Sequence, residues 1–217
     1  MRKNLSVIVC VCISYFFISC NNTASNEHEI TLSKKLLSTK LLNSERIKQK
    51  FGNYGIEVLS QTNVTRVSNL YSSNKGAKVT RTFAVVTYSE KIDSSHSKIH
   101  SQIINGASIG RVFKKNGWNI IKKPLYKGAI ESRSEDFYHV YDLMSIQKKS
   151  LAFYMYNFHI QKDSVEHNYA TITEVYHPLY INTKTLNLIY KDQQVPVKKT
   201  DTIDSILEIV YEKMQSN

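Results

Sequence analysis

The feature that most constrains the fold is a ten-residue run, LAFYMYNFHI, at positions 151–160. Nearly every position is apolar, so a strand built from this run would present two apolar faces. Such a strand is typical of the middle of a sheet. A second strand-like stretch, residues 168–176, follows the polar turn at 162–167. We therefore predict a hairpin whose first strand is central.

Other stretches also have strand character. Residues 56–71 and 78–88 are rich in Val, Thr, Phe and Tyr, and the polar segment 72–76 separates them. This composition predicts a second antiparallel hairpin. Residues 118–126 are a third candidate region. Residues 128–149 suit a helix or a strand, and both interpretations stay open.

Helical spacing of apolar residues recurs in four segments: 32–51, 95–116, 183–190 and 203–214. Asn182 or Thr183 is a suitable N-cap for the third segment, and Asp201 for the fourth. We therefore expect an α+β fold, in which helices pack on one face of a mostly antiparallel sheet of about five strands. A C-terminal amphipathic helix completes this expectation.

The N-terminal segment has the pattern of an export signal. Arg2 and Lys3 precede an almost uncharged apolar run, residues 5–19. A membrane-spanning helix needs about 20 apolar residues, and this run is shorter and is followed directly by polar residues. The pattern favours a secretory signal over a membrane span.

The end of that run, Phe17-Ile18-Ser19-Cys20, resembles the lipobox of bacterial lipoproteins. The resemblance covers only the first twenty residues. It implies cleavage before Cys20, a diacylglycerol on the Cys20 sulfur, and acylation of the new amine, for example by palmitate. Two or more acyl chains anchor a protein stably, at roughly 0.8 kcal/mol per buried methylene. Asn21, where Asp would favour the inner membrane, points by the same resemblance to the outer membrane of the cell envelope.

The expected organisation has three parts: a signal peptide at 1–19, a polar flexible tether at 20–31, and a single α+β domain at 32–217. An ordinary cleaved signal and an uncleaved anchor are the alternatives at the N-terminus. All three cysteines lie within the first twenty residues. A mature chain lipidated on Cys20 would therefore have no thiol for a disulfide, a metal site or a nucleophile.

The charge of the chain favours anionic partners. The net charge is +11, and removing Arg2 and Lys3 with the signal lowers it to +9. Such a surplus attracts phospholipid or acidic polymers, although lysines spread for solubility would give the same total. Residues 33–51 hold six cations against the single Glu45, close enough to the anchor to meet anionic headgroups. They are Lys34, Lys35, Lys40, Arg46, Lys48 and Lys50.

Histidines supply the candidate metal ligands. His96 and His100 are four residues apart on a predicted helix, a spacing at which two imidazoles can share one metal ion. The residues between them include no Glu, so a partly buried structural histidine is the alternative. His159 and His167 flank the second predicted turn, where they could face each other beside two carboxylates.

No catalytic motif stands out, and the acid pairs fall at predicted turns and helix starts. Tyr154, Tyr156 and Phe158 alternate on one strand face, which suits either a ligand surface or a core. We therefore expect a non-enzymatic envelope lipoprotein with no catalytic residue and no cofactor. It would bind the membrane through its anchor, and an envelope protein or acidic polymer, but no nucleic acid. The alternatives are an anchored hydrolase or metal-dependent enzyme, and a ligand-capturing accessory of an uptake system.

Overall fold

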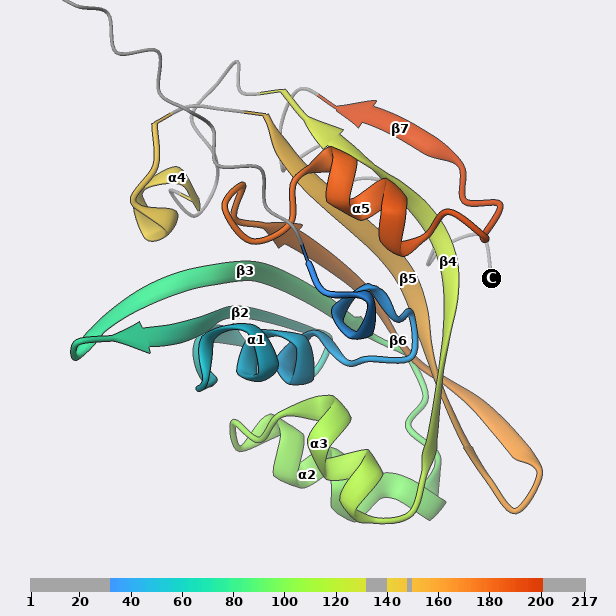
Figure 1. The fold of residues 1–217 in the computed structure, drawn as a ribbon. Helices are drawn as coiled ribbons and strands as arrows, with labels where there is room; N and C mark the ends of the chain where they lie inside the picture. The colour runs from blue at the N-terminus through green and yellow to red at the C-terminus, as the bar shows by residue number, and fades with distance from the viewer. Residues whose placement is uncertain (1–31, 132–139, 148–149, 201–217) are drawn as a thin grey trace, which may run out of the picture.

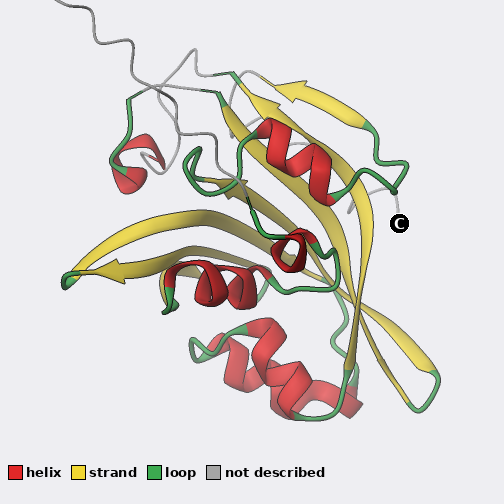
Figure 2. Cartoon of the chain, viewed as in Figure 1, coloured by secondary structure: helices red, strands yellow, loops and turns green. Residues whose placement is uncertain are grey.

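A seven-stranded sheet forms the centre of the computed structural model, which describes residues 32–131, 140–147 and 150–200 (Figures 1 and 2). The strand order is β1-β2-β3-β6-β5-β4-β7. All neighbouring strands are antiparallel except β4 and β7, which are parallel. The strands are β1 Gly55–Gln61, β2 Thr65–Asn74, β3 Ala77–Tyr88, β4 Asn119–Ile130, β5 Leu151–Lys162, β6 Val165–Tyr176 and β7 Val197–Thr200.

Five short α-helices and two 3-10 helices surround the sheet, and none of these described helices is long and apolar enough to cross a membrane. The predicted helix at 95–116 is two helices, because Gly106 takes a left-handed φ of 96° between them. The predicted cap at Asn182 is confirmed, since its Oδ1 accepts a hydrogen bond from the Thr185 amide. The elements are η1 Lys34–Leu37, α1 Asn43–Phe51, η2 Ser94–His96, α2 Ser97–Ile104, α3 Ile109–Lys115, α4 Val140–Met144 and α5 Thr183–Ile189.

The expected fold class, about five mostly antiparallel strands with helices on one face, is wrong. Residues 56–71 form two strands, because the Thr62 hydroxyl accepts hydrogen bonds from the Val64 and Thr65 amides and closes a turn. β7 adds a parallel edge strand and makes the sheet mixed. The predicted helix at 203–214 and the N-terminal segment 1–31 lie outside the described residues.

Helices cover both faces of the sheet rather than one. Alternate side chains of β5 enter two separate cores, with Tyr154 and Tyr156 in one and Phe153 and Met155 in the other. The first core also holds side chains from α1, α2, α3 and α5, whereas α4 packs into the second, apart from the other helices (Figure 1). The prediction that β5 is central is confirmed, since it lies between β6 and β4 and residues 151–156 are all buried.

Two buried arginines hold the short helices in place. Arg46 of α1 is 1% exposed and donates to the carbonyl oxygens of Leu36 and Ser38, each at 2.9 Å. Arg66 of β2 is also 1% exposed and donates to the carbonyls of Ile103, Gly106 and Ala107 at 2.8–3.3 Å. Arg66 therefore satisfies the backbone where α2 turns into α3, and this positions α3 beside α1.

Candidate functional site

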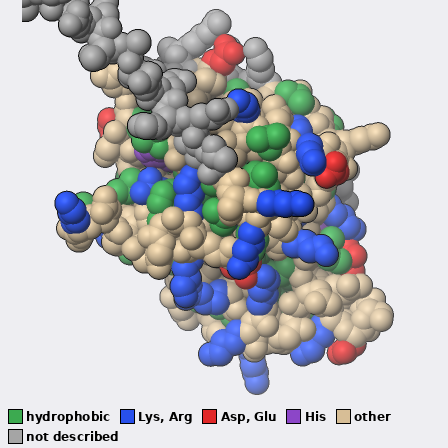
Figure 3. All heavy atoms as spheres, viewed as in Figure 1, with side chains coloured by type: hydrophobic (Ala, Val, Ile, Leu, Met, Phe, Trp, Pro, Cys, Tyr) green, Lys and Arg blue, Asp and Glu red, His purple; other side chains and the backbone are tan. Residues whose placement is uncertain are grey.

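A basic groove lies between α1 and α3. Its volume is about 510 Å³, and its lining includes Lys48, Arg111, Lys114 and Lys115, with Glu45 as the one acid among the described lining residues. Lys and Arg side chains gather on the surface over these two helices (Figure 3). The groove is therefore a concave cationic surface, formed where two helix flanks meet.

Glu45 organises one side of this groove. Its carboxylate accepts a hydrogen bond from the Leu42 amide at 2.8 Å and one from Lys114 Nζ at 2.7 Å. Partial burial raises the pKa of Glu45, but the hydrogen bonds from Lys114 and Leu42 outweigh that effect and lower it overall. Glu45 is thus a stable anion that offsets the charge of Lys114.

The remaining groove cations have no acidic partner in the part of the chain that the structure describes. Among the described residues no carboxylate forms an ion pair with Lys48, Arg111 or Lys115. The Arg111 guanidinium lies 5.6 Å from the ring centroid of Tyr54, which orients it without neutralising it. These three cations are available to an anionic partner.

The structure changes the membership of the predicted basic cluster. Arg46 belongs to the interior, whereas Lys34, Lys35, Lys40 and Lys48 are exposed. Sequence reasoning missed the cations of α3, because they lie more than sixty positions further along the chain. Lys114 and Lys115 follow Arg111 by three and four positions, and this helical spacing was the available signal.

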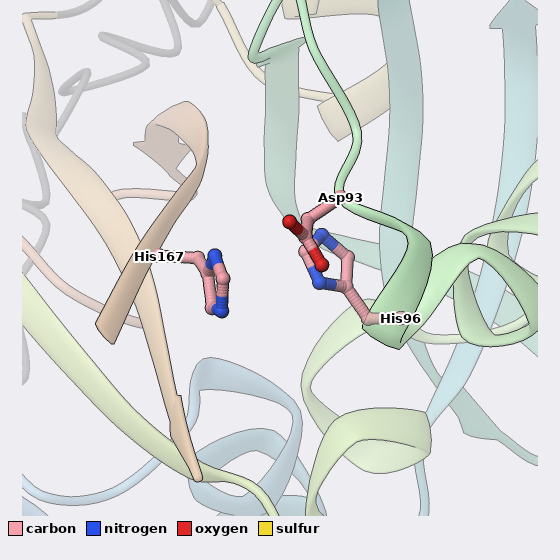
Figure 4. Close-up of side chains that lie close together, drawn as sticks. All are labelled: Asp93, His96 and His167. Atoms are coloured by element: carbon pink, nitrogen blue, oxygen red, sulfur yellow. The ribbon is translucent and has the colours of Figure 1, made fainter. Parts of the chain in front are cut away.

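A second cluster brings together Asp93, His96 and His167 (Figure 4). Each offers one potential ligand atom, and these atoms all lie within 4.8 Å of one another. His100, the predicted partner of His96, is placed elsewhere: its Nδ1 lies 2.8 Å from the Tyr169 hydroxyl. The predicted pairing is wrong because His96 is the last residue of η2 and precedes α2. The two histidines therefore do not lie on successive turns of one helix.

Local contacts hold this cluster in place. Asp93 is the N-cap of η2, and its Oδ1 accepts a hydrogen bond from the Ser95 amide at 2.8 Å. The His96 ring is 3% exposed and packs edge-on against Trp118 and Tyr169, with centroid distances of 5.7 and 5.8 Å. Burial, and then the neighbouring His167, lower the pKa of His96, which favours the neutral imidazole that metals bind.

The predicted pairing of His159 with His167 is wrong. In the β5–β6 register His159 is opposite Asn168, and His167 is opposite Ile160. Because adjacent strand positions point to opposite faces, the two histidines lie on different sides of the hairpin. His159 instead contacts Glu166, with 2.7 Å between Nδ1 and Oε1.

The tyrosine-rich strand face is interior and not an exposed ligand surface. Tyr154, Tyr156 and Phe158 are 0–3% exposed and belong to the larger core. Burial raises the pKa of Tyr156 well above its usual value, so its hydroxyl stays protonated and donates to Glu174. Tyr176 donates to the same carboxylate at 2.7 Å. These groups form a buried hydrogen-bonded network.

Two further pockets, both partly open to solvent, lie beside these tyrosines. The more apolar one is about 70 Å³, well below the roughly 300 Å³ of typical small-molecule pockets. The other is about 160 Å³, and its lining includes Tyr154, Tyr190 and Gln193, each with a buried polar atom that has no hydrogen-bond partner among the described residues. Lys122 also lines it, and burial lowers the pKa of Lys122 to about 8. A polar cavity of this size suits ordered water, and neither cavity favours capture of an uptake ligand.

Comparison with known proteins adds no further constraint. No protein-family model matches the chain, and no curated protein is significantly similar to it. The function is therefore inferred from the chemistry of the groove and of the histidine cluster.

Proposed function

We propose that this protein is a lipid-anchored, non-enzymatic module of the bacterial cell envelope that binds the anionic headgroups of its own membrane. The observation that carries this proposal is the groove between α1 and α3, with three cations that no described carboxylate neutralises. Anionic phosphates complement such a surface in both charge and hydrogen bonding.

The position of the proposed anchor supports contact with the bilayer. Lys34, where η1 begins, is fourteen positions after Cys20. A fully extended chain of that length spans at most about 50 Å. Since only five residues separate η1 from α1, the basic groove is within reach of a membrane that holds Cys20.

Headgroup contact would be weak without the anchor. Each cation near an anionic surface contributes about 1 kcal/mol, so Lys48, Arg111 and Lys115 together contribute about 3 kcal/mol. An anchor makes the contact intramolecular and raises the effective concentration of the surface. We therefore expect the anchor to supply attachment, and the groove to set how the domain lies on the membrane.

Intact-mass analysis of protein extracted from membranes tests the anchor. The expected mass is that of a chain beginning at Cys20 with a diacylglycerol and an additional acyl group. A Cys20→Ala variant should lose this modification and leave the membrane fraction. A variant that is processed normally and still sediments with membranes would refute the lipid attachment.

Vesicle sedimentation tests the groove separately, with a lipid-free version beginning at Asn21. We expect association with vesicles containing phosphatidylglycerol, none with pure phosphatidylcholine, and loss of binding at high salt because screening weakens exposed charges. Equal association with both vesicles would contradict the proposal. So would binding to an acidic polysaccharide without binding to vesicles, which would indicate a glycan partner instead.

A further inference from the structure

The cluster of Asp93, His96 and His167 has the donor set of a transition-metal site. It offers two imidazole nitrogens and one carboxylate oxygen, all within 4.8 Å of one another. Calcium and magnesium take mainly oxygen ligands, so two imidazoles argue against them. Imidazole with a carboxylate suits zinc, which is commonly bound by three protein ligands and one water.

Neighbouring groups orient two of the three ligands. The Ser95 amide holds Asp93 Oδ1 at 2.8 Å, which fixes the carboxylate and leaves its second oxygen for an ion. His96 Nδ1 lies 3.3 Å from the Ser95 hydroxyl, so its other nitrogen remains for coordination. Hydrogen bonds to the ligating side chains orient them and are typical of metal sites in proteins.

The ligands come from two separate parts of the fold. Asp93 and His96 flank η2, which leads into α2, whereas His167 lies on β6 near the end of the β5–β6 hairpin and points toward them (Figure 4). The two histidine rings have a centroid distance of 5.3 Å. An ion at this position would connect the helical layer to the hairpin.

We infer that Asp93, His96 and His167 bind one zinc ion, with a fourth coordination position open to water. Tetrahedral zinc with bonds of about 2.0–2.1 Å holds its ligand atoms about 3.4 Å apart. The present separations, at most 4.8 Å, require shifts of less than about 1.5 Å on metal binding. Side-chain rotation of Asp93 and His167 can supply them without moving the sheet.

Trp118 provides a direct readout of this site. It is the only tryptophan of the chain, and its ring centroid lies 5.7 Å from that of His96 and 6.0 Å from that of His167. A paramagnetic ion such as cobalt(II), bound in place of zinc, should quench its fluorescence. Tetrahedral cobalt also has a characteristic visible absorption.

The test is titration of the chelator-treated, purified protein with zinc chloride by calorimetry, and with cobalt chloride by fluorescence and absorption. We expect one ion per chain. Asp93→Asn and His167→Gln should each weaken zinc binding at least tenfold and remove the cobalt signals. Asn is as good an N-cap as Asp, so the first variant removes the charge and keeps the η2 start intact.

His159→Gln is the matched control, since it removes a histidine from the other side of the same hairpin. It should leave the zinc affinity unchanged, and circular dichroism should show the wild-type fold in all three variants. Absence of stoichiometric zinc binding by the wild-type protein would overturn the assignment. So would zinc binding that survives His167→Gln with its affinity unchanged.

Discussion

The interior of the protein and the groove between α1 and α3 hold cations in opposite ways. Arg46 and Arg66 are 1% exposed, and their guanidinium groups donate to backbone carbonyls. Lys48, Arg111 and Lys115 are exposed and have no ion-pair partner among the described residues. Burial, and not residue type, therefore determines whether a cation has a structural role or is available to a partner.

The groove depends on the interior cations. α1, α2 and α3 have nine, eight and seven residues, and helices this short are not stable alone. Arg66 fixes the turn between α2 and α3, and Arg46 fixes η1 against α1. The buried arginines therefore hold the segments next to the two helices that form the groove.

Arg66→Ala should give the largest effect on stability. It leaves the carbonyls of Ile103, Gly106 and Ala107 buried without their donor, so the free energy of unfolding should fall by about 3–5 kcal/mol. Urea unfolding followed by circular dichroism measures it. Arg111→Ala, the exposed control, should change the value by less than about 0.5 kcal/mol. If both variants lost the same free energy of unfolding, the buried and the exposed cations would not differ in their contribution to stability.

The interior also contains a buried histidine, His177, that we expect to stay neutral in the folded protein. Burial, followed by the effect of Arg81, lowers the pKa of His177 from 6.5 to about 4. Between these values the unfolded chain binds the proton more readily, so stability falls as the pH drops from 6.5 to 4, by about 3 kcal/mol in total. Chemical unfolding across this range measures the loss.

His177→Asn is the comparison variant for this pH dependence. The Nδ1 of His177 accepts a hydrogen bond from the Leu179 amide, and an Asn carbonyl oxygen offers a similar acceptor. The variant should show a pH dependence about 3 kcal/mol smaller than the wild type over the same range. An identical slope in both proteins would mean that His177 is not held neutral.

Replacing Lys48, Arg111 and Lys115 by Ala should weaken vesicle binding without unfolding the protein. Loss of about 1 kcal/mol per cation corresponds to roughly a hundredfold lower affinity for anionic vesicles. The control removes the same charge outside the groove, at Lys75, Lys123 and Lys191. Sedimentation should separate the two triple variants, and similar losses would show that net charge alone governs binding.

Glu45→Gln should produce the smallest effect, and in the opposite direction. The Gln carbonyl can still accept from the Leu42 amide, but the charge that offsets Lys114 is gone. Affinity for anionic vesicles should rise a few-fold, and stability should change by less than about 1 kcal/mol because this ion pair is partly exposed. A lower affinity would place Glu45 outside the headgroup contact.

Local patterns explain which parts of the fold could be predicted. The central strand β5, its hairpin with β6 and the cap of α5 each depend on residues close in sequence. The parallel pairing of β7 with β4 depends on distant segments, and its four residues have no strand pattern of their own. The end of α2 near Gly106 could not be predicted, because the helical spacing of apolar residues continues past this position.

The functional residues were harder to predict for the same reason. Arg46 and Lys48 are two positions apart, and only the packing of α1 shows that one is buried and the other exposed. The His96–His100 spacing suggested a metal site by local periodicity, yet the ligand near His96 is the distant His167. Sequence alone singled out both His96 and His167, but it paired them with His100 and His159, and it did not identify Asp93 as a ligand.

Chemical acylation of lysines tests the proposed orientation most directly. The anchored protein is labelled on phosphatidylglycerol vesicles, and mass spectrometry measures how far each lysine has reacted. Lys114 and Lys123 are a matched pair: both form an ion pair with a glutamate, and their side chains are 43% and 52% exposed. Lys114 and Lys48 should lose reactivity on the membrane, whereas Lys123, which belongs to a different region of the surface, should keep it. Equal reactivity of Lys114 and Lys123 on the vesicles would contradict the proposal that the groove faces the bilayer.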